Sequence, residues 1–165
     1  MSYTPLIIAN TFIERFGAIE GITHMKLQKL VYCSHGWWLV FQDGPVVNEK
    51  PQVWKFGPVF NGLYHTLSLY GNEPIKKAHS TSPFSPPKTL SHEDDAQVSQ
   101  LIDWVWERYG HLSGTALSDL THKPGSAWYK LAKPHNFKIP FDIPIPDNEV
   151  KAEFKKIYEE EGAAA

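Results

Sequence analysis

The segment between Thr23 and the turn at residues 43–45 constrains the fold more than any other part of the chain. Thr23 is a favourable N-cap, and the apolar side chains that follow it recur at helical spacing. One face of this helix carries Leu27, Leu30, Val31, Ser34 and Trp38. Beyond Tyr32 almost every position is apolar or small, and a helix that is apolar on most sides has to be buried. The sequence therefore predicts a central helix with the rest of the domain packed around it.

Further segments show the apolar periodicity and the end signals of helices. They cover residues 5–16, 58–71, 91–109, 113–121, 126–132 and the chain from 147 onward. Pro58 suits a first helical position, and Ser91 with Asp94 forms a variant of the capping box. With the central helix, we therefore expect about six or seven helices.

Extended chain is expected in two regions. Residues 46–47 and 52–55 predict two short strands around a turn at 48–50. Between 139 and 146 bulky residues alternate with prolines, which lack an N–H, so only one edge of this stretch can pair, as in an edge strand added to the hairpin. The predicted fold class is α+β, predominantly α-helical, with a small β-hairpin. We expect one compact domain over residues 1–161 and a tail at 162–165 that is either natural or a cloning remnant.

Charge and cysteine content narrow the class of protein. The net charge of −2 provides no electrostatic footprint for nucleic acid or for an anionic membrane. Cys33 is the only cysteine, so no disulfide can form within the chain and a reducing compartment is favoured. The N-terminus lacks the pattern of a signal peptide, and no apolar stretch is long enough to span a bilayer. We expect a cytoplasmic protein that has no membrane partner and does not bind nucleic acid.

No residue pattern predicts catalysis, a cofactor or a metal site. The eight histidines never occur at a metal-ligand spacing such as HxxxH. Cys33 and His35 are two positions apart on a helix, so their side chains point about 200° apart and cannot form a nucleophile–base pair. Neither a glycine-rich phosphate cradle nor a GxSxG motif is present. We therefore expect a protein that is not an enzyme.

Three side chains are candidates for contact with a partner. Trp104 lies outside the apolar stripe of its helix and between acidic neighbours, as an interface anchor does, although it could equally cover a neighbouring helix. Lys26 and Lys29 lie opposite the apolar face of the central helix and could contact a phosphate or a partner, unless they only solvate that face. The proline-rich loop at 72–90 is a candidate for a mobile or partner-responsive segment, with a plain connector as the alternative.

Several motifs, in order along the chain, resemble those of one family. They are residues 26–32 (KLQKLVY), 35–37 (HGW), 54–59 (WKFGPV), 63–65 (LYH), 117–122 (LSDLTH) and Trp128. Together they resemble the Panacea antitoxin domain, the SocA-like family of bacterial and phage proteins. By periodicity we expect a buried core that includes Leu30, Val31, Trp54 and Val59. The motif residues expected to be mainly structural are Leu27, Gln28, Leu30, Tyr32, Trp54, Gly57, Pro58, Tyr64, Thr121, His122 and Trp128.

The resemblance implies a binding protein. It implies an antitoxin that neutralises a co-encoded toxin by direct contact and without catalysis, as a monomer or a homodimer. One branch of the family acts as an adaptor that delivers its toxin to an ATP-dependent protease, so a protease is an alternative partner. Two alternatives come from other classes. The first is a DNA-binding transcriptional regulator, in which helix, hairpin and helix mimic a winged helix. The second is a hydrolase, for which a nucleophile–base pair is lacking.

Overall fold

The computed structural model describes residues 2–139 and 142–164, and within them the chain is mostly helical. The helices are α1 (Pro5–Phe16), α2 (His24–Phe41), α3 (Asn61–Leu67), α4 (Ala96–Tyr109), α5 (Gly114–His122), α6 (Ala127–Ala132) and α7 (Asp147–Ala164), with short 3-10 turns η1 (Ser68–Tyr70) and η2 (Lys133–His135). A two-stranded antiparallel sheet pairs β1 (Gln52–Trp54) with β2 (Gly57–Val59). The structure confirms the predicted α+β class. None of the described helices is long and apolar enough to cross a membrane.

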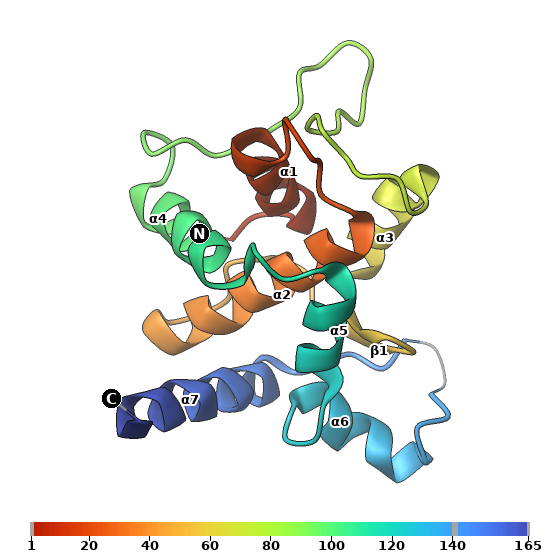
Figure 1. Ribbon diagram of the computed structural model, residues 1–165, viewed down its shortest axis with the longest axis vertical. Helices are drawn as coiled ribbons and strands as arrows, with labels where there is room; N and C mark the ends of the chain where they lie inside the picture. The colour runs from red at the N-terminus through yellow and green to blue at the C-terminus, as the bar shows by residue number, and fades with distance from the viewer. Residues whose placement is uncertain (1, 140–141, 165) are drawn as a thin grey trace.

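Helix α2 is the centre of the molecule, as predicted from its sequence. It contacts α1, α3, α4, α5, α7 and β2. Figure 1 shows it crossing the middle of the fold, with α1 and α4 on one side and α7 on the other. Its Leu27, Leu30 and Val31 side chains are fully buried, and Tyr32 donates a hydrogen bond to Glu153 of α7 at 2.7 Å. Because α2 is enclosed on most sides, only its two ends leave room for side chains that reach the surface.

The hairpin lies further along the chain than the sequence predicted. Residues 46–47 form no strand of the sheet, since Val47 makes only an isolated bridge with Tyr3. The reversal occurs instead between β1 and β2, where Gly57 adopts φ +110, a left-handed conformation that favours glycine. Pro58 is therefore part of β2, opposite Val53, and is not the first residue of a helix. Val53 directs its N–H away from Pro58, toward the Ile143 carbonyl at 2.9 Å, so the missing proline N–H costs no hydrogen bond.

The stretch at 143–145 lies antiparallel beside β1, where the added edge was expected, but it forms an isolated bridge and not a third strand of the sheet. Besides the bond from Val53, the Ile145 N–H donates to the Pro51 carbonyl at 2.7 Å. Gln52 and Pro144 form an isolated bridge. The backbone groups that pair with β1 and its neighbour Pro51 are the carbonyl of Ile143 and the N–H of Ile145. Both are odd-numbered residues, as the alternation of prolines predicted. Residues 140 and 141 of the predicted strand lie outside the described residues.

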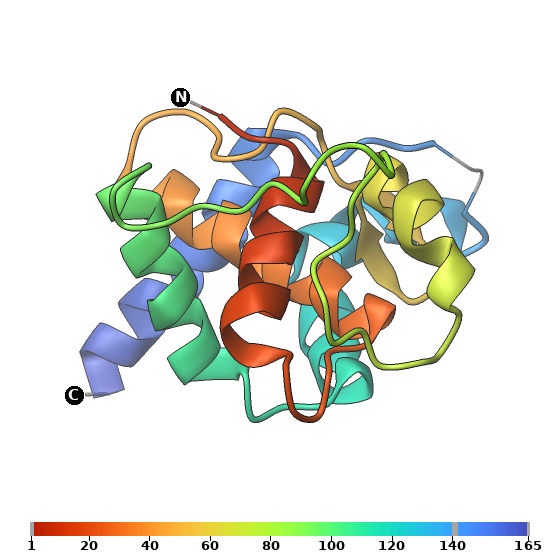
Figure 2. The same cartoon turned by 90° about the horizontal axis from the view of Figure 1, so that it is seen from above.

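The loop at 72–90 has no regular element, as predicted, but it is tied to α1 at several points. The buried Asn10 amide donates to the carbonyls of His79 and Lys88 and accepts from the His79 N–H at 2.8 Å. Thr11 accepts from the Leu90 N–H at 3.0 Å. Figure 2 shows the loop lying across α1. Polar side chains on one helix therefore fix the path of a segment far away in sequence.

The ends of two helices differ from the prediction. Ser91 and Asp94 do hydrogen-bond to each other, but they close a turn, and α4 begins at Ala96 with Asp95 as its N-cap. The predicted stripe of α4 is buried, as expected. At the other end of the chain α7 continues to Ala164, so most of the expected tail is helical.

Candidate functional site

The family-like motifs meet at the hairpin, where they hydrogen-bond the backbone. The carbonyls of Trp54, Phe56, Pro58 and Phe60, at alternate positions, each accept a hydrogen bond from a side chain of another element. The donors are Trp128 Nε1 at 2.6 Å, Ser118 Oγ, Lys29 Nζ at 2.8 Å and Gln28 Nε2 at 3.2 Å, respectively. A short hairpin leaves such groups unpaired, and buried carbonyls without partners destabilise a fold. The polar motif residues therefore act as a frame that holds the hairpin to α2, α5 and α6.

Lys29 is buried within this frame, so the expectation that it lies on a solvated face is wrong. Only 1% of the residue is exposed, and burial lowers the pKa of its ammonium group to about 7. A Cβ atom added to Gly57 would lie 3.0 Å from Lys29 Nζ. The glycine therefore provides both the turn conformation and the space for the lysine. A direct contact between Lys29 and a partner has no support in this placement.

Gln28 fixes the start of α3. Its amide oxygen accepts from the Phe60 N–H at 2.9 Å, and its amide nitrogen donates to the Phe60 carbonyl. The same nitrogen lies 3.1 Å from Nε2 of His24, which must accept because the amide nitrogen can only donate. Burial lowers the pKa of His24 to about 4, so the ring stays neutral at ordinary pH. Phe60 has no side-chain cap of its own, and Gln28 fixes the position of this N-cap residue by bonding both of its backbone groups.

Beside this frame lies an open pocket of about 420 Å³ between α2, α3 and the turn of the hairpin. We call it the hairpin pocket and define it by Met25, Trp54, Lys55, Phe56, Val59 and Tyr64. The sequence predicted Trp54 and Val59 as core residues, and this is wrong, since both are half-buried. Val53 of β1 points into the core, and because successive side chains of a strand point to opposite faces, Trp54 points outward. The Trp54 ring instead packs against Tyr64, with ring centroids 4.8 Å apart.

The other motif residues are placed around α5 and α6. Thr121 and Trp128 are buried, and His122 packs against Trp128 with ring centroids 5.3 Å apart. Leu27, Leu30 and Tyr32 belong to the core around α2. Lys26 is half-buried and caps α4, since its ammonium group donates to the Gly110 carbonyl and lies 4.9 Å from the Trp106 ring centroid.

A second surface forms where the C-terminal parts of α2, α4 and α7 meet. We call it the aromatic patch and define it by Phe41, Trp104 and Tyr158. The Trp104 ring stands edge-on to Phe41 and to the buried Trp37, with centroids 5.8 and 5.1 Å apart. Trp104 is 37% exposed, so its ring covers its neighbours and also reaches solvent. The two roles considered from the sequence, interface anchor and cover for a neighbouring helix, are therefore compatible. Phe41 lies one helical turn after Trp37 and could have been found from that spacing, whereas Tyr158 comes from a distant helix.

Arg108 orders the aromatic patch. Its guanidinium lies 5.4 Å from the Trp104 ring centroid and 4.8 Å from that of Trp37, and it pairs with Glu161 of α7. The stacked cation limits the rotation of the two rings. The patch is thus a rigid group of aromatic side chains with charged residues at its edge.

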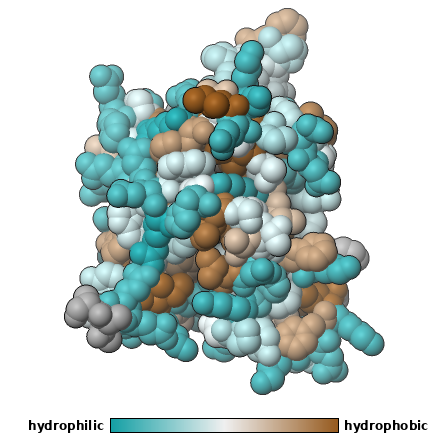
Figure 3. Space-filling view, viewed as in Figure 1, coloured by the Kyte–Doolittle hydropathy of each residue, from teal (hydrophilic) through white to brown (hydrophobic). Residues whose placement is uncertain are grey.

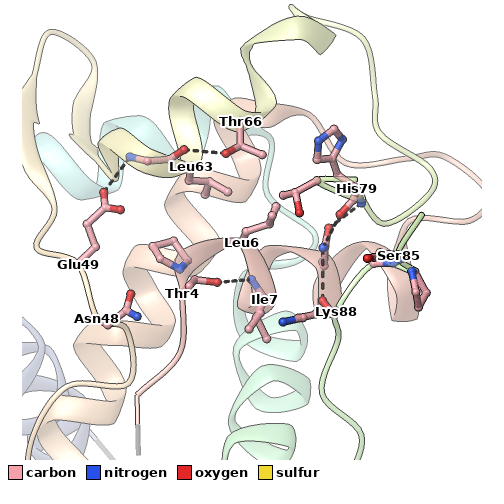
Figure 4. A pocket seen from close by; sticks show the side chains of 16 residues that line it. Thr4, Leu6, Ile7, Asn48, Glu49, Leu63, Thr66, His79, Ser85 and Lys88 are labelled. Carbon is pink, nitrogen blue, oxygen red and sulfur yellow. Dashed lines mark hydrogen bonds between the residues drawn. The ribbon is translucent and has the colours of Figure 1, made fainter. Parts of the chain in front are cut away.

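A further pocket of about 480 Å³ lies between α1, α3 and the loop at 72–90 (Figure 4). Several of its polar groups already have partners. Thr4 caps α1 by accepting from the Ile7 N–H, and Glu49 accepts from the Gly62 N–H at the start of α3, at 3.0 Å. His79 is bonded to Tyr70 and, through its backbone, to Asn10. These bonds order the starts of α1 and α3 and hold the loop against α1.

The described residues show no arrangement suited to nucleophilic or metal chemistry. Cys33 is buried, which raises the pKa of its thiol, and His35 bonds to Asp147 instead, with Nε2 and Oδ1 3.1 Å apart. No group of three or more metal-ligating side chains is found in the described part of the chain. The surface does expose several large apolar side chains that could contact a partner. On the face in Figure 3, hydrophobic side chains form small groups between hydrophilic ones.

Comparison with known proteins identifies one kind of relative. A family model described as "Antitoxin SocA-like, Panacea domain" matches residues 27–129. The chain is also similar to Antitoxin SocA of Caulobacter vibrioides (strain NA1000 / CB15N), with 29% identity over 157 residues that cover 90% of this chain and 80% of the relative. No solved structure matches. The matched range contains the hairpin and all four side chains that hold its carbonyls.

Proposed function

Since this chain belongs to the SocA-like Panacea domain family of antitoxins, we propose that it neutralises a co-encoded toxin by direct protein–protein binding. The binding is stoichiometric and involves no catalysis. The family places the chain in a toxin–antitoxin system, and the proposal adds how it acts within that system.

The aromatic patch is the observation that carries the proposal. Phe41 and Tyr158 are each about half-exposed, and the Phe41 ring contacts both Tyr158 and Trp104. Binding energy at protein interfaces concentrates in such aromatic anchors, especially where charged residues surround them. Since the patch is already ordered by Trp37 and Arg108, little side-chain entropy is lost on binding. We propose Trp104 as the central contact, and Lys26 has a supporting structural role at most.

Two alternatives differ in how they use the surface. A protease adaptor would bind the toxin in the same way and differ only in the fate of the toxin, so the aromatic patch supports the shared step. A winged-helix regulator needs a hairpin that stands free to reach DNA. Here the turn of the hairpin is bonded to α5 through Ser118 and the Phe56 carbonyl, so this alternative has less support.

The test is co-expression with the neighbouring reading frame. We expect growth arrest by the neighbour to be relieved when this chain is expressed, and the two proteins to co-purify at a fixed ratio. Size-exclusion chromatography with light scattering gives that ratio and shows whether the chain is a monomer or a homodimer. Growth arrest that persists despite ample expression of the folded chain would refute the proposal. Toxin levels before and after expression separate neutralisation by binding from delivery to a protease, which lowers them.

A further inference from the structure

We propose that the hairpin pocket is a second binding site, for a short acidic segment of a protein partner that places an apolar side chain between Trp54 and Phe56 and a carboxylate beside Lys55. This site is separate from the aromatic patch. Met25 and Phe41, one from each surface, are sixteen positions apart on α2, which corresponds to about 24 Å of helix. Figure 1 shows the hairpin near one end of α2 and the C-terminal ends of α2 and α7 at the other.

The shape of the pocket fits one or two side chains of a peptide. Its volume of about 420 Å³ lies within the range of ligand sites. Its walls are apolar: Phe56 is 57% exposed at the turn, Met25 and Tyr64 are partly exposed, and Trp54 lies between them. Several large apolar side chains exposed around one hollow are unusual for a surface that has no partner.

The charge of the pocket selects an acidic partner. The exposed Lys55 supplies the positive charge at its edge, and none of the described lining residues is a carboxylate. The Lys55 ammonium lies 5.3 Å from the Phe56 ring centroid, and the described residues include no ion pair for Lys55. The chain as a whole carries a net charge of −2, so this hollow has the opposite sign to the molecule. A segment with Asp or Glu next to Leu or Phe complements both properties.

The frame makes the pocket a preformed site. Trp128 and Lys29 hold the two strands of the hairpin through the Trp54 and Pro58 carbonyls, and Gln28 holds the following residue, Phe60. The exposed side chains of the turn, Lys55 and Phe56, make none of these bonds. A preformed pocket needs little ordering when a ligand binds, and its two exposed side chains can be changed without removing the frame.

The test uses synthetic peptides and nuclear magnetic resonance of the whole chain. One pool holds acetylated, amidated hexapeptides with Leu or Phe flanked by Asp and Glu, and a matched pool replaces the acids by Asn and Gln. We expect the acidic pool to shift the Trp54 indole N–H resonance in a saturable way, and the neutral pool to need about tenfold more peptide. Equal shifts from both pools, or no shift from either, would overturn the proposal.

Matched variants locate the binding. Phe56→Ala and Lys55→Gln should each weaken binding of the acidic pool about tenfold or more. Phe84→Ala and Lys77→Gln change an exposed phenylalanine and an exposed lysine outside the pocket and should leave binding unchanged. Unaltered melting temperatures verify that the variants fold. If Phe56→Ala and Lys55→Gln bind like wild type, the peptides bind elsewhere and the site is wrong. Since no toxin is present in this assay, its outcome is independent of the proposed neutralisation.

Discussion

The hairpin pocket and the aromatic patch both expose aromatic rings, but they are built by different interactions. The pocket rests on hydrogen bonds from buried polar side chains, such as Lys29 and Gln28, to backbone groups of the hairpin. The patch rests on contacts between rings, with Trp37 beneath Trp104 and Phe41. The first kind of support depends on a few defined atoms, whereas the second depends on the volume that the rings fill. The two regions should therefore respond differently to substitution, pH and truncation.

The largest effect is expected beneath the patch. Trp37→Ala removes a fully buried ring that contacts α4 and α7, so the free energy of unfolding should fall by about 3–5 kcal/mol, the usual cost of emptying an aromatic core site. Denaturant unfolding followed by circular dichroism measures it. A loss below about 1 kcal/mol would mean that the patch does not depend on ring packing.

A somewhat smaller effect is expected in the frame of the pocket. Gln28→Leu leaves the N–H and carbonyl of Phe60 without their side-chain partner in a buried place, so the free energy of unfolding should fall by about 2–4 kcal/mol. Met25→Ala, on the same helix but partly exposed, is the control and should cost less than about 1 kcal/mol. Equal stability of the two variants would show that the frame is not held by hydrogen bonds.

The patch should lose binding without losing the fold when its exposed ring is removed. Trp104→Ala is expected to weaken toxin binding by about 2 kcal/mol, close to thirtyfold, because truncating an interface anchor has this effect. Titration calorimetry of the purified pair measures it, and Phe84→Ala, 95% exposed on the distant loop, is the control. Stability should change far less than in Trp37→Ala. A large drop in melting temperature with intact affinity would assign Trp104 to the core alone.

The smallest effect, taken per pH unit, concerns pH and distinguishes the pocket from the patch. The pKa of Lys29 falls from 10.5 in the unfolded chain to about 7 in the fold, so between these values the unfolded state binds more protons and stability rises with pH. The slope cannot exceed about 1.4 kcal/mol per pH unit for one group. We expect wild type to gain stability between pH 7 and 9 relative to Lys29→Met. Glu153, whose pKa burial raises to about 7, titrates at the lower edge of this window, but it is present in both proteins and cancels in the comparison. Parallel profiles for the two proteins would show that the Lys29 ammonium stays charged.

Short-range patterns in the sequence were sufficient for most of the helices. The stripe of α4, with Val98, Ile102 and Val105, is buried because a 3.6-residue period places those side chains on one face whatever packs there. Thr23 and Ser113 cap α2 and α5 by accepting from N–H groups three residues ahead, a contact that local sequence specifies. The buried, central position of α2 follows in the same way from its apolar composition. These features depend on residues within one or two turns of each other.

The tertiary structure alone decided which polar motif residues are buried and where the surface sites lie. A helical wheel predicts that Lys29 is solvated. Its ammonium group is buried because it bonds to the carbonyl of Pro58, which lies 29 positions later in the chain. The same holds for Asn10, which fixes His79 and Lys88 of a distant loop. Trp54 was predicted as a core residue from the apolar periodicity, but the register of β1 turned Val53 inward instead. A hydrogen bond or a strand register between distant segments depends on how the whole chain packs, and no local period encodes it.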